Sequence, residues 1–150
     1  MFQDDTPALL AALQGLGRCV QLMTNGSLPF DRVPAAVRKV VDVKSPVSAI
    51  ARASATPEGD TTPFFRDANL AWLGELDEIK FVVRDRAELE WATRFAVRRG
   101  LFDRVGAVSA GPAWGVLDPA VLADWLVASK LPWRLNVQVH KLLWGGDTRR

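Results

Sequence analysis

The residues best suited to ligand chemistry follow a short apolar run near the start of this 150-residue sequence. Thr24, Asn25 and Gly26 come directly after the apolar residues that end at Met23. They offer a hydroxyl, an amide and a glycine backbone, and α/β proteins present such groups to ligands at the carboxyl ends of parallel strands. An isolated Asn-Gly pair is more commonly a simple turn. Whether these residues form a ligand-facing loop or a simple turn depends on the pattern of the rest of the sequence.

Polar residues also interrupt three other apolar runs, namely Asp42 with Lys44, Lys80, and Asn136 with Gln138. Strands of a parallel sheet are usually buried on both faces, so a charge inside one must be paired or must line a polar cavity. Two interpretations stay open. One is a structural ion pair such as Asp42 with Lys80, and the other is a barrel interior lined for a polar ligand.

Strand patterns and helix patterns alternate along the chain. The predicted strands cover residues 18–23, 39–44, 79–83, 104–109 (broken by Gly111-Pro112) and 134–139. The predicted helices cover 6–16, 34–38, 64–74 and 85–100, and one more starts at Asp118-Pro119, with Thr6, Asp85 and Asp118 as caps. Such alternation is typical of βαβ units, so we expect one α/β domain over residues 1–150 around a parallel sheet.

Right-handed crossovers put the carboxyl ends of all five predicted strands on one rim. The groups expected there are Thr24 to Gly26, Lys44 with Ser45, Arg84, Ser109 to Pro112, and His140 with Lys141. Polar groups gathered on one rim favour a site there. Residues 47–63 are rich in small and polar residues and predict a long loop.

Composition excludes several classes of function. The net charge is +2 and the basic residues are scattered, so no nucleic-acid partner is expected. No apolar run approaches the roughly 18 residues of a membrane span. The acidic start of the chain has no signal-peptide pattern, so a cytoplasmic location is the default expectation.

The chain has one cysteine and one histidine, Cys19 and His140. A single cysteine supports neither a disulfide nor a zinc or iron–sulfur site, so Cys19 is expected to be a small buried residue. No metal ligand and no catalytic residue is predicted. A hydrolase that uses His140 with Ser45 or Ser109 is an alternative, but the sequence has no Gly-x-Ser-x-Gly elbow to support it.

Four segments in order carry a family resemblance: Thr-Asn-Gly-Ser-Leu-Pro, Val-Asp-Val-Lys-Ser-Pro, Asp-Glu-Ile-Lys-Phe-Val-Val-Arg-Asp-Arg and Gln-Val-His-Lys-Leu-Leu-Trp. They resemble the C-terminal part of the 7-carboxy-7-deazaguanine synthases, which are radical S-adenosylmethionine (SAM) enzymes of queuosine biosynthesis. The resemblance implies an incomplete (β/α) barrel, often dimeric. It also implies a carbon–nitrogen lyase that converts 6-carboxy-5,6,7,8-tetrahydropterin to 7-carboxy-7-deazaguanine with SAM, a [4Fe-4S] cluster and Mg²⁺.

The resemblance assigns roles to individual residues. On the cofactor side it implies the residues Thr24, Asn25, Gly26, Asp42, Lys44, Ser45, Pro46, Gly111, Pro112 and Ala113. On the substrate side it implies Gln138 and His140, next to Lys141 at the end of the last predicted strand.

Several family features have no counterpart in the sequence. The three-cysteine cluster loop, the Gly-Gly-Glu motif and an N-terminal substrate-binding segment would lie before residue 1, and Met23 stands where the family usually has glutamate. We therefore expect the C-terminal half of such an enzyme, inactive alone, which pairs with an N-terminal half or a second copy. The alternative is a free-standing half-barrel binding module, and in either case the first strand would be an exposed apolar edge.

Overall fold

The structure, a computed structural model, describes residues 5–46, 62 and 64–145. Its elements in chain order are α1 (Thr6–Gly15), β1 (Gln21–Thr24), β2 (Arg38–Val43), the 3-10 helix η1 (Asp67–Trp72), β3 (Glu78–Val83), α3 (Arg86–Arg98), α4 (Leu101–Arg104), β4 (Ala107–Pro112), α5 (Pro119–Ser129), β5 (Trp133–Leu135) and α6 (Val139–Trp144). All five strands pair in parallel, in the order β1-β2-β3-β4-β5. The predicted α/β class with a parallel sheet is confirmed.

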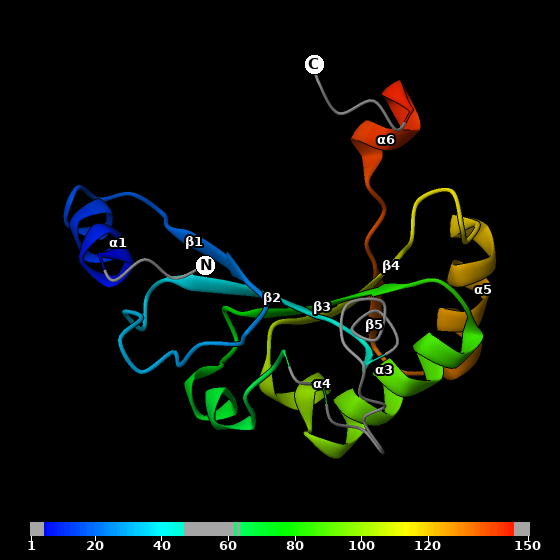
Figure 1. Ribbon diagram of the computed structural model, residues 1–150, viewed down its shortest axis with the longest axis horizontal. Coiled ribbons are helices and arrows are strands. Elements are labelled where there is room, and N and C mark those ends of the chain that lie inside the picture. The colour runs from blue at the N-terminus through cyan, green and yellow to red at the C-terminus, as the bar shows by residue number, and fades with distance from the viewer. Residues whose placement is uncertain (1–4, 47–61, 63, 146–150) are drawn as a thin grey trace.

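Helices cover one face of the sheet, which we call the covered face. Helices α3 and α4 lie on the same side of the strands, and α6 projects on the other side (Figure 1). Val41, Ile79 and Val108 point to the covered face and are at most 2% exposed. Phe81 lies at its centre, with ring centroids 5.8 Å from Phe95 and 5.9 Å from Trp133. This face supplies the apolar core because successive side chains along each strand point to opposite faces, and the apolar residues of the neighbouring strands are in register.

The opposite face, which we call the open face, carries the residues between those of the core. In register across the sheet these are Met23 with Val40, Val40 with Glu78, and Glu78 with Ala107. The next row consists of Asp42, Lys80, Ser109 and Arg134, one residue on each of β2 to β5. Asp42, Lys80, Ser109 and Arg134 therefore share one face. Lys39 of β2 points to the covered face, where it is 3% exposed and forms an ion pair with Asp77 at 3.2 Å.

Two of the predicted helix starts are confirmed. Asp85 precedes α3 and its side chain accepts a hydrogen bond from the Glu88 backbone amide at 2.9 Å. Asp118 precedes α5 and accepts from the Ala120 amide at 2.8 Å. Helix α1 starts as predicted with a proline in its first turn, but the capping position is Asp5, without a side-chain bond, and not Thr6.

The last predicted strand, 134–139, was wrong at its carboxyl end. Strand β5 stops at Leu135, and His140 and Lys141 lie in helix α6. Asn136 still donates its backbone amide to the Ala110 carbonyl at 2.8 Å. The next bond of a parallel ladder would need an amide hydrogen at Pro112, which proline lacks. The pairing with β4 therefore ends there, and the chain turns into α6.

The predicted fourth strand, 104–109, was displaced. Residues 101–104 form α4, and β4 runs from Ala107 through Gly111 to Pro112 instead of breaking before them. Gly111 and Pro112 keep their register with Val82 and Val83 of β3, and the following Ala113 amide donates to the Val83 carbonyl at 2.8 Å. The missing proline N–H faces β5, so the β3 side of the ladder is unaffected.

The N-terminal part also differs from the prediction. Strand β1 is an end strand with alternating exposure, and Met23 is 64% exposed, so this strand is not buried. Cys19, expected to be buried, is exposed because it precedes this edge. Residues 34–37 form turns leading into β2, which starts at Arg38, so the helix predicted over 34–38 was wrong, and the helix predicted over 64–74 is the short 3-10 helix η1. Most of the predicted loop 47–63 lies outside the described residues.

Candidate functional site

The loop after β1 has a defined geometry at the carboxyl edge of the sheet. The Gly26 amide donates to the Thr24 hydroxyl at 3.2 Å, and the Ser27 amide donates to the Asn25 side chain at 3.1 Å. Gly26 has φ +77°, and a Cβ atom there would lie 2.6 Å from a ring carbon of Phe65. Glycine is thus required by both backbone conformation and space. A cavity of about 310 Å³ borders Thr24, Asn25 and Met23.

A buried asparagine from η1 fixes this loop. Asn69 is 1% exposed and donates its side-chain amide to the carbonyls of Gly26 at 2.8 Å and Leu28 at 2.9 Å. Its side-chain oxygen accepts from the Phe30 amide at 3.1 Å. Sequence reasoning missed Asn69. Its role depends on partners about 40 positions away, and no local motif marks it.

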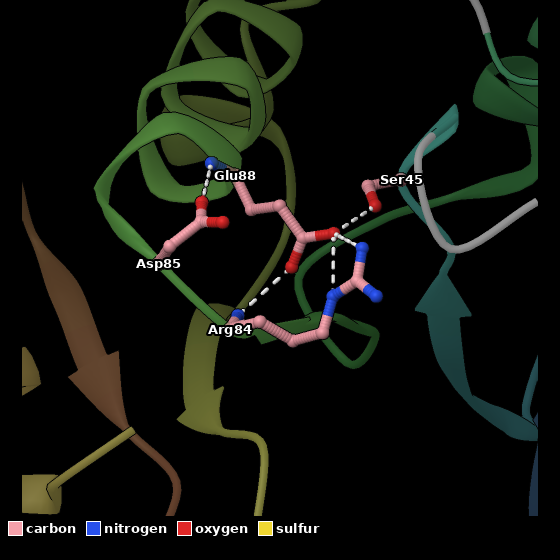
Figure 2. A network of polar contacts seen from close by, with 4 residues as sticks. All are labelled: Ser45, Arg84, Asp85 and Glu88. Atoms are coloured by element: carbon pink, nitrogen blue, oxygen red, sulfur yellow. Dashed lines mark hydrogen bonds and ion pairs between the residues drawn. The ribbon is translucent and has the colours of Figure 1, made fainter. Parts of the chain in front are cut away.

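A second network joins the strand ends of β2 and β3 (Figure 2). Ser45, which follows β2, donates its hydroxyl to Glu88 at 2.7 Å. Arg84, which follows β3, donates its backbone amide to Glu88 at 2.8 Å and its guanidinium to the same carboxylate at 2.8 and 3.2 Å. Glu88 is 3% exposed, so these bonds compensate for the burial of its charge. The hydrogen bond and ion pair to Glu88 also raise the pKa of Arg84.

The network places two predicted rim residues, Ser45 and Arg84, on one carboxylate. Asp85 caps α3 as predicted. Glu88 stands three residues after this cap, where a capping box would return its side chain to the Asp85 amide, but it accepts from the Arg84 amide and so links the helix start to the rim. Pro46 follows Ser45 and is buried.

Asp42 and Lys44 form an ion pair with each other. Lys80, the partner suggested for Asp42, is in register with it on β2 and β3, but Asp42 forms its structural ion pair with Lys44 instead. One oxygen of Asp42, Oδ1, is buried and has no hydrogen-bond partner among the described residues. These charges lie on the open face, and an interior lined for a polar ligand stays a prediction.

The carboxyl end of β4 packs closely against the residue that follows β5. A Cβ atom at Gly111 would lie 2.4 Å from the Asn136 carbonyl oxygen, so the residue there must be glycine for β4 and the end of β5 to pack. Pro112 borders a cavity of about 430 Å³, together with Trp114, Gln138 and Leu142. Ala113 is fixed by its bond to β3 and does not line this cavity.

The substrate-side residues predicted from the sequence are separated by the change from strand to helix. Gln138 lines the cavity, whereas His140 is exposed on α6 and does not. Lys141 lies with its ammonium 6.0 Å from the centre of the Trp114 ring. The structure thus brings Gln138 and Pro112 together and leaves His140 outside.

The geometry opposes the hydrolase alternative. The Ser45 hydroxyl donates to Glu88 and the Ser109 hydroxyl donates to Glu78 at 2.8 Å, so both hydroxyl hydrogens are directed at carboxylates. No group of three or more His, Cys, Asp or Glu side chains that could hold a metal ion is found in the described part of the chain. The sequence has one cysteine, so its own residues do not fit a [4Fe-4S] cluster.

The fold and the rim together define a class of protein. A parallel βα sheet with ligand-type groups after β1, β2 and β4 and polar residues on its open face is consistent with part of a radical SAM (β/α) barrel. Among residues 5–46, 62 and 64–145, no helix is long and apolar enough to cross a membrane. Neither a family model nor a solved structure matches the chain.

Curated relatives give the particular protein that the chain resembles. It is 37% identical over 145 residues to the 7-carboxy-7-deazaguanine synthase of Koribacter versatilis, covering 89% of this chain and 59% of the relative. It is 33% identical over 151 residues to the synthase of Chlorobaculum tepidum, covering 99% and 64%. The synthase of Methanospirillum hungatei is 28% identical over 142 residues, covering 94% and 53%. The resemblance predicted from the motifs is confirmed, and the chain spans about three-fifths of the length of the first two relatives.

Proposed function

We propose that the chain belongs to the 7-carboxy-7-deazaguanine synthases and forms the C-terminal part of the barrel that converts 6-carboxy-5,6,7,8-tetrahydropterin to 7-carboxy-7-deazaguanine. The observation that carries this proposal is the similarity over nearly the whole chain to relatives of that name. Support comes from the parallel sheet, whose rim bears the residues that the resemblance assigns to the cofactor side.

The residues of the chain fit a role in holding SAM. The glycines at 26 and 111 let the rim pack against Phe65 and Asn136, and the loop after β1 is fixed by Asn69 before any ligand binds. SAM supplies the hydrogen-abstracting chemistry when bound, and the protein binds and orients it. In this proposal Thr24, Asn25 and Gly26 present hydrogen-bonding groups to the cofactor.

The network around Glu88 would hold the strand end of β2 in place beside the same cofactor. Ser45 and Pro46 border the ligand, and Glu88 fixes Ser45 relative to Arg84 and α3. Because this preorganisation is built into the fold, binding would cost little ordering of the rim. Gln138, in the cavity beside Pro112, is the candidate for a hydrogen bond to the pterin ring.

The cluster is the part of the chemistry that these residues do not supply. We propose that the cluster ligands come from another polypeptide segment, either an N-terminal half or a partner, and that Mg²⁺ is also held elsewhere. We propose no step through either group. Strand β1 is suited to pair with such a segment, because it is the end strand of the sheet and Met23 on it is 64% exposed.

The proposal is tested by complementation. Residues 1–150 are co-expressed with the N-terminal part of the Koribacter versatilis relative, the cluster is reconstituted anaerobically, and 7-carboxy-7-deazaguanine is measured by mass spectrometry. We expect product only when both polypeptides are present. A Gly26→Val variant, which cannot adopt the loop after β1, is expected to give no product. Absence of product with a fully reconstituted cluster and wild-type chain would contradict the proposal.

A non-catalytic half-barrel binding module is the second candidate, favoured by the rigid rim alone. It predicts a monomer that melts cooperatively and binds SAM but does not complement. The same co-expression separates the two candidates.

A further inference from the structure

A continuous polar row crosses the open face of the sheet. Asp42, Lys80, Ser109 and Arg134 are register partners on β2, β3, β4 and β5. Neighbouring strands lie about 4.8 Å apart, so Lys80 and Arg134 start about 10 Å apart on either side of Ser109. Both side chains are long enough to converge above the short serine.

The acidic groups around this row already have partners. Glu78 binds Arg38 at 2.8 Å and also accepts the Ser109 hydroxyl at 2.8 Å. Asp42 is paired with Lys44 through Oδ2. In the described part of the chain, Lys80 and Arg134 form no side-chain hydrogen bond or ion pair, so two cations share this row without a counter-ion.

A charge that is partly shielded from water gains more from an opposite charge than an exposed one does. Ser109 is 1% exposed and Lys80 is half-buried, so the middle of this row is shielded from water, whereas Arg134 at its β5 end is exposed. An ammonium held in such a place is stabilised when an anion lies against it. At the other end of the row, the Oδ1 oxygen of Asp42 is buried and accepts no hydrogen bond from residues 5–46, 62 or 64–145. An anion beside Lys80 and a hydrogen-bond donor beside Asp42 Oδ1 would each satisfy a group that the described residues leave without a partner.

We propose that Lys80 and Arg134 bind the carboxylate of a small ligand on the open face, and that Asp42 Oδ1 accepts a hydrogen bond from a donor group of the same ligand. This proposal deepens the proposed function and rests on it only for the choice of ligands. Two sources of the carboxylate fit: a carboxylated pterin, whose ring carries N–H donors, and the methionyl end of SAM, whose ammonium is the donor.

Isothermal titration calorimetry of the full 150-residue chain tests the proposal with two matched ligand pairs. One pair is pterin-6-carboxylate and pterin, and the other is SAM and 5′-methylthioadenosine. We expect the carboxylate member of one pair to bind at least about tenfold more tightly than its control, the effect of one charge-assisted hydrogen bond. The pair that shows the difference identifies the source of the carboxylate.

Variants then assign the effect to residues. Lys80→Gln and Arg134→Gln are each expected to remove the carboxylate preference, roughly tenfold, without changing the affinity for the control ligand. Lys80→Arg, which keeps the charge, should retain most of it. Arg32→Gln is the matched control, because Arg32 is an exposed cation of the β1–β2 connection outside the row. Far-ultraviolet circular dichroism and melting curves establish that each variant is folded.

The outcomes separate this proposal from the proposed function. A carboxylate preference that both glutamine variants leave intact, or no binding of either carboxylate ligand by wild type, overturns the site. If the site is confirmed but complementation gives no 7-carboxy-7-deazaguanine, the proposed function fails and the carboxylate site stands. If complementation succeeds and the glutamine variants keep full carboxylate preference, the proposed function stands and the carboxylate site fails.

Discussion

The two faces of the sheet are made from the same five strands and differ in almost every physical respect. The covered face carries Val41, Ile79 and Phe81, all at most 1% exposed, under helices α3 and α4. The open face carries Asp42 and Lys80 in the alternate positions. A fully buried parallel sheet would be apolar on both faces. The difference teaches that the apolar positions of these strands hold the fold, whereas the open face leaves Lys80 and Arg134 free, among the described residues, for the binding role that we propose.

The largest loss of stability is expected from a substitution on the covered face. Phe81→Ala removes a ring that packs against Phe95, Trp91 and Trp133 and should lower the free energy of unfolding by about 3–5 kcal/mol. Urea denaturation followed by circular dichroism measures it. Met23→Ala on the open face, 64% exposed, is the control and should change stability by less than about 0.5 kcal/mol. Equal losses in both variants would mean that the two faces do not differ as described.

A smaller loss is expected where a buried polar group fixes the rim. Asn69→Ala leaves the Phe30 amide and the carbonyls of Gly26 and Leu28 without their buried partner, at a cost of about 2–3 kcal/mol. Amide hydrogen exchange should accelerate at Phe30 first. Asn69→Asp keeps the acceptor for Phe30 and loses the two donated bonds, so protection at Phe30 should survive better in it. Unchanged exchange in both variants would show that Asn69 does not fix the loop.

The Glu88 network is expected to contribute less. Glu88→Gln keeps the shape but weakens the bonds to Arg84, and it should cost about 1–2 kcal/mol because the Arg84 side chain is partly exposed. The raised pKa of Arg84 contributes stability that is present below the ordinary arginine pKa and lost only as pH rises through the raised value. The loss should therefore be constant across neutral pH in urea titrations. A loss that vanished between mildly acidic and mildly alkaline pH would argue against this pair.

The smallest effect on stability is expected on the open face itself. Lys80→Gln removes a half-buried cation that has no partner in the described part of the chain, so the free energy of unfolding should change by less than about 0.5 kcal/mol. Thermal melts at matched concentration check this. A large loss of stability would show that Lys80 supports the fold, and the contrast between the faces would then be weaker than we describe.

The sequence predicted those parts of the fold whose signals are local. Strands β2 and β3 were placed within a residue or two because each is a short run rich in β-branched and aromatic residues, and α3 was placed because Asp85 caps it directly. The placement of Thr24 and Ser45 at the ends of β1 and β2 was also predicted, and their role in binding stays a proposal.

The remainder depends on contacts that no local pattern reveals. The end of β5 is set by a missing amide hydrogen at Pro112, on a neighbouring strand 20 or more positions away. The exposure of Cys19 follows from the place of β1 at the sheet edge. Asn69 acts across about 40 residues of sequence. Each of these features depends on tertiary contacts, which override the local conformational preference of the sequence.

The strict order of the strands has a consequence for how the chain folds. Every strand pairs with its neighbours in sequence, from β1 to β5 without a crossing. Contacts are therefore close along the chain, which favours rapid folding relative to sheets that join distant strands. Each βα unit can add to the one before it as the polypeptide emerges during synthesis. An end strand such as β1 is then a growing edge, to which a segment made earlier or supplied separately can be added in the same way.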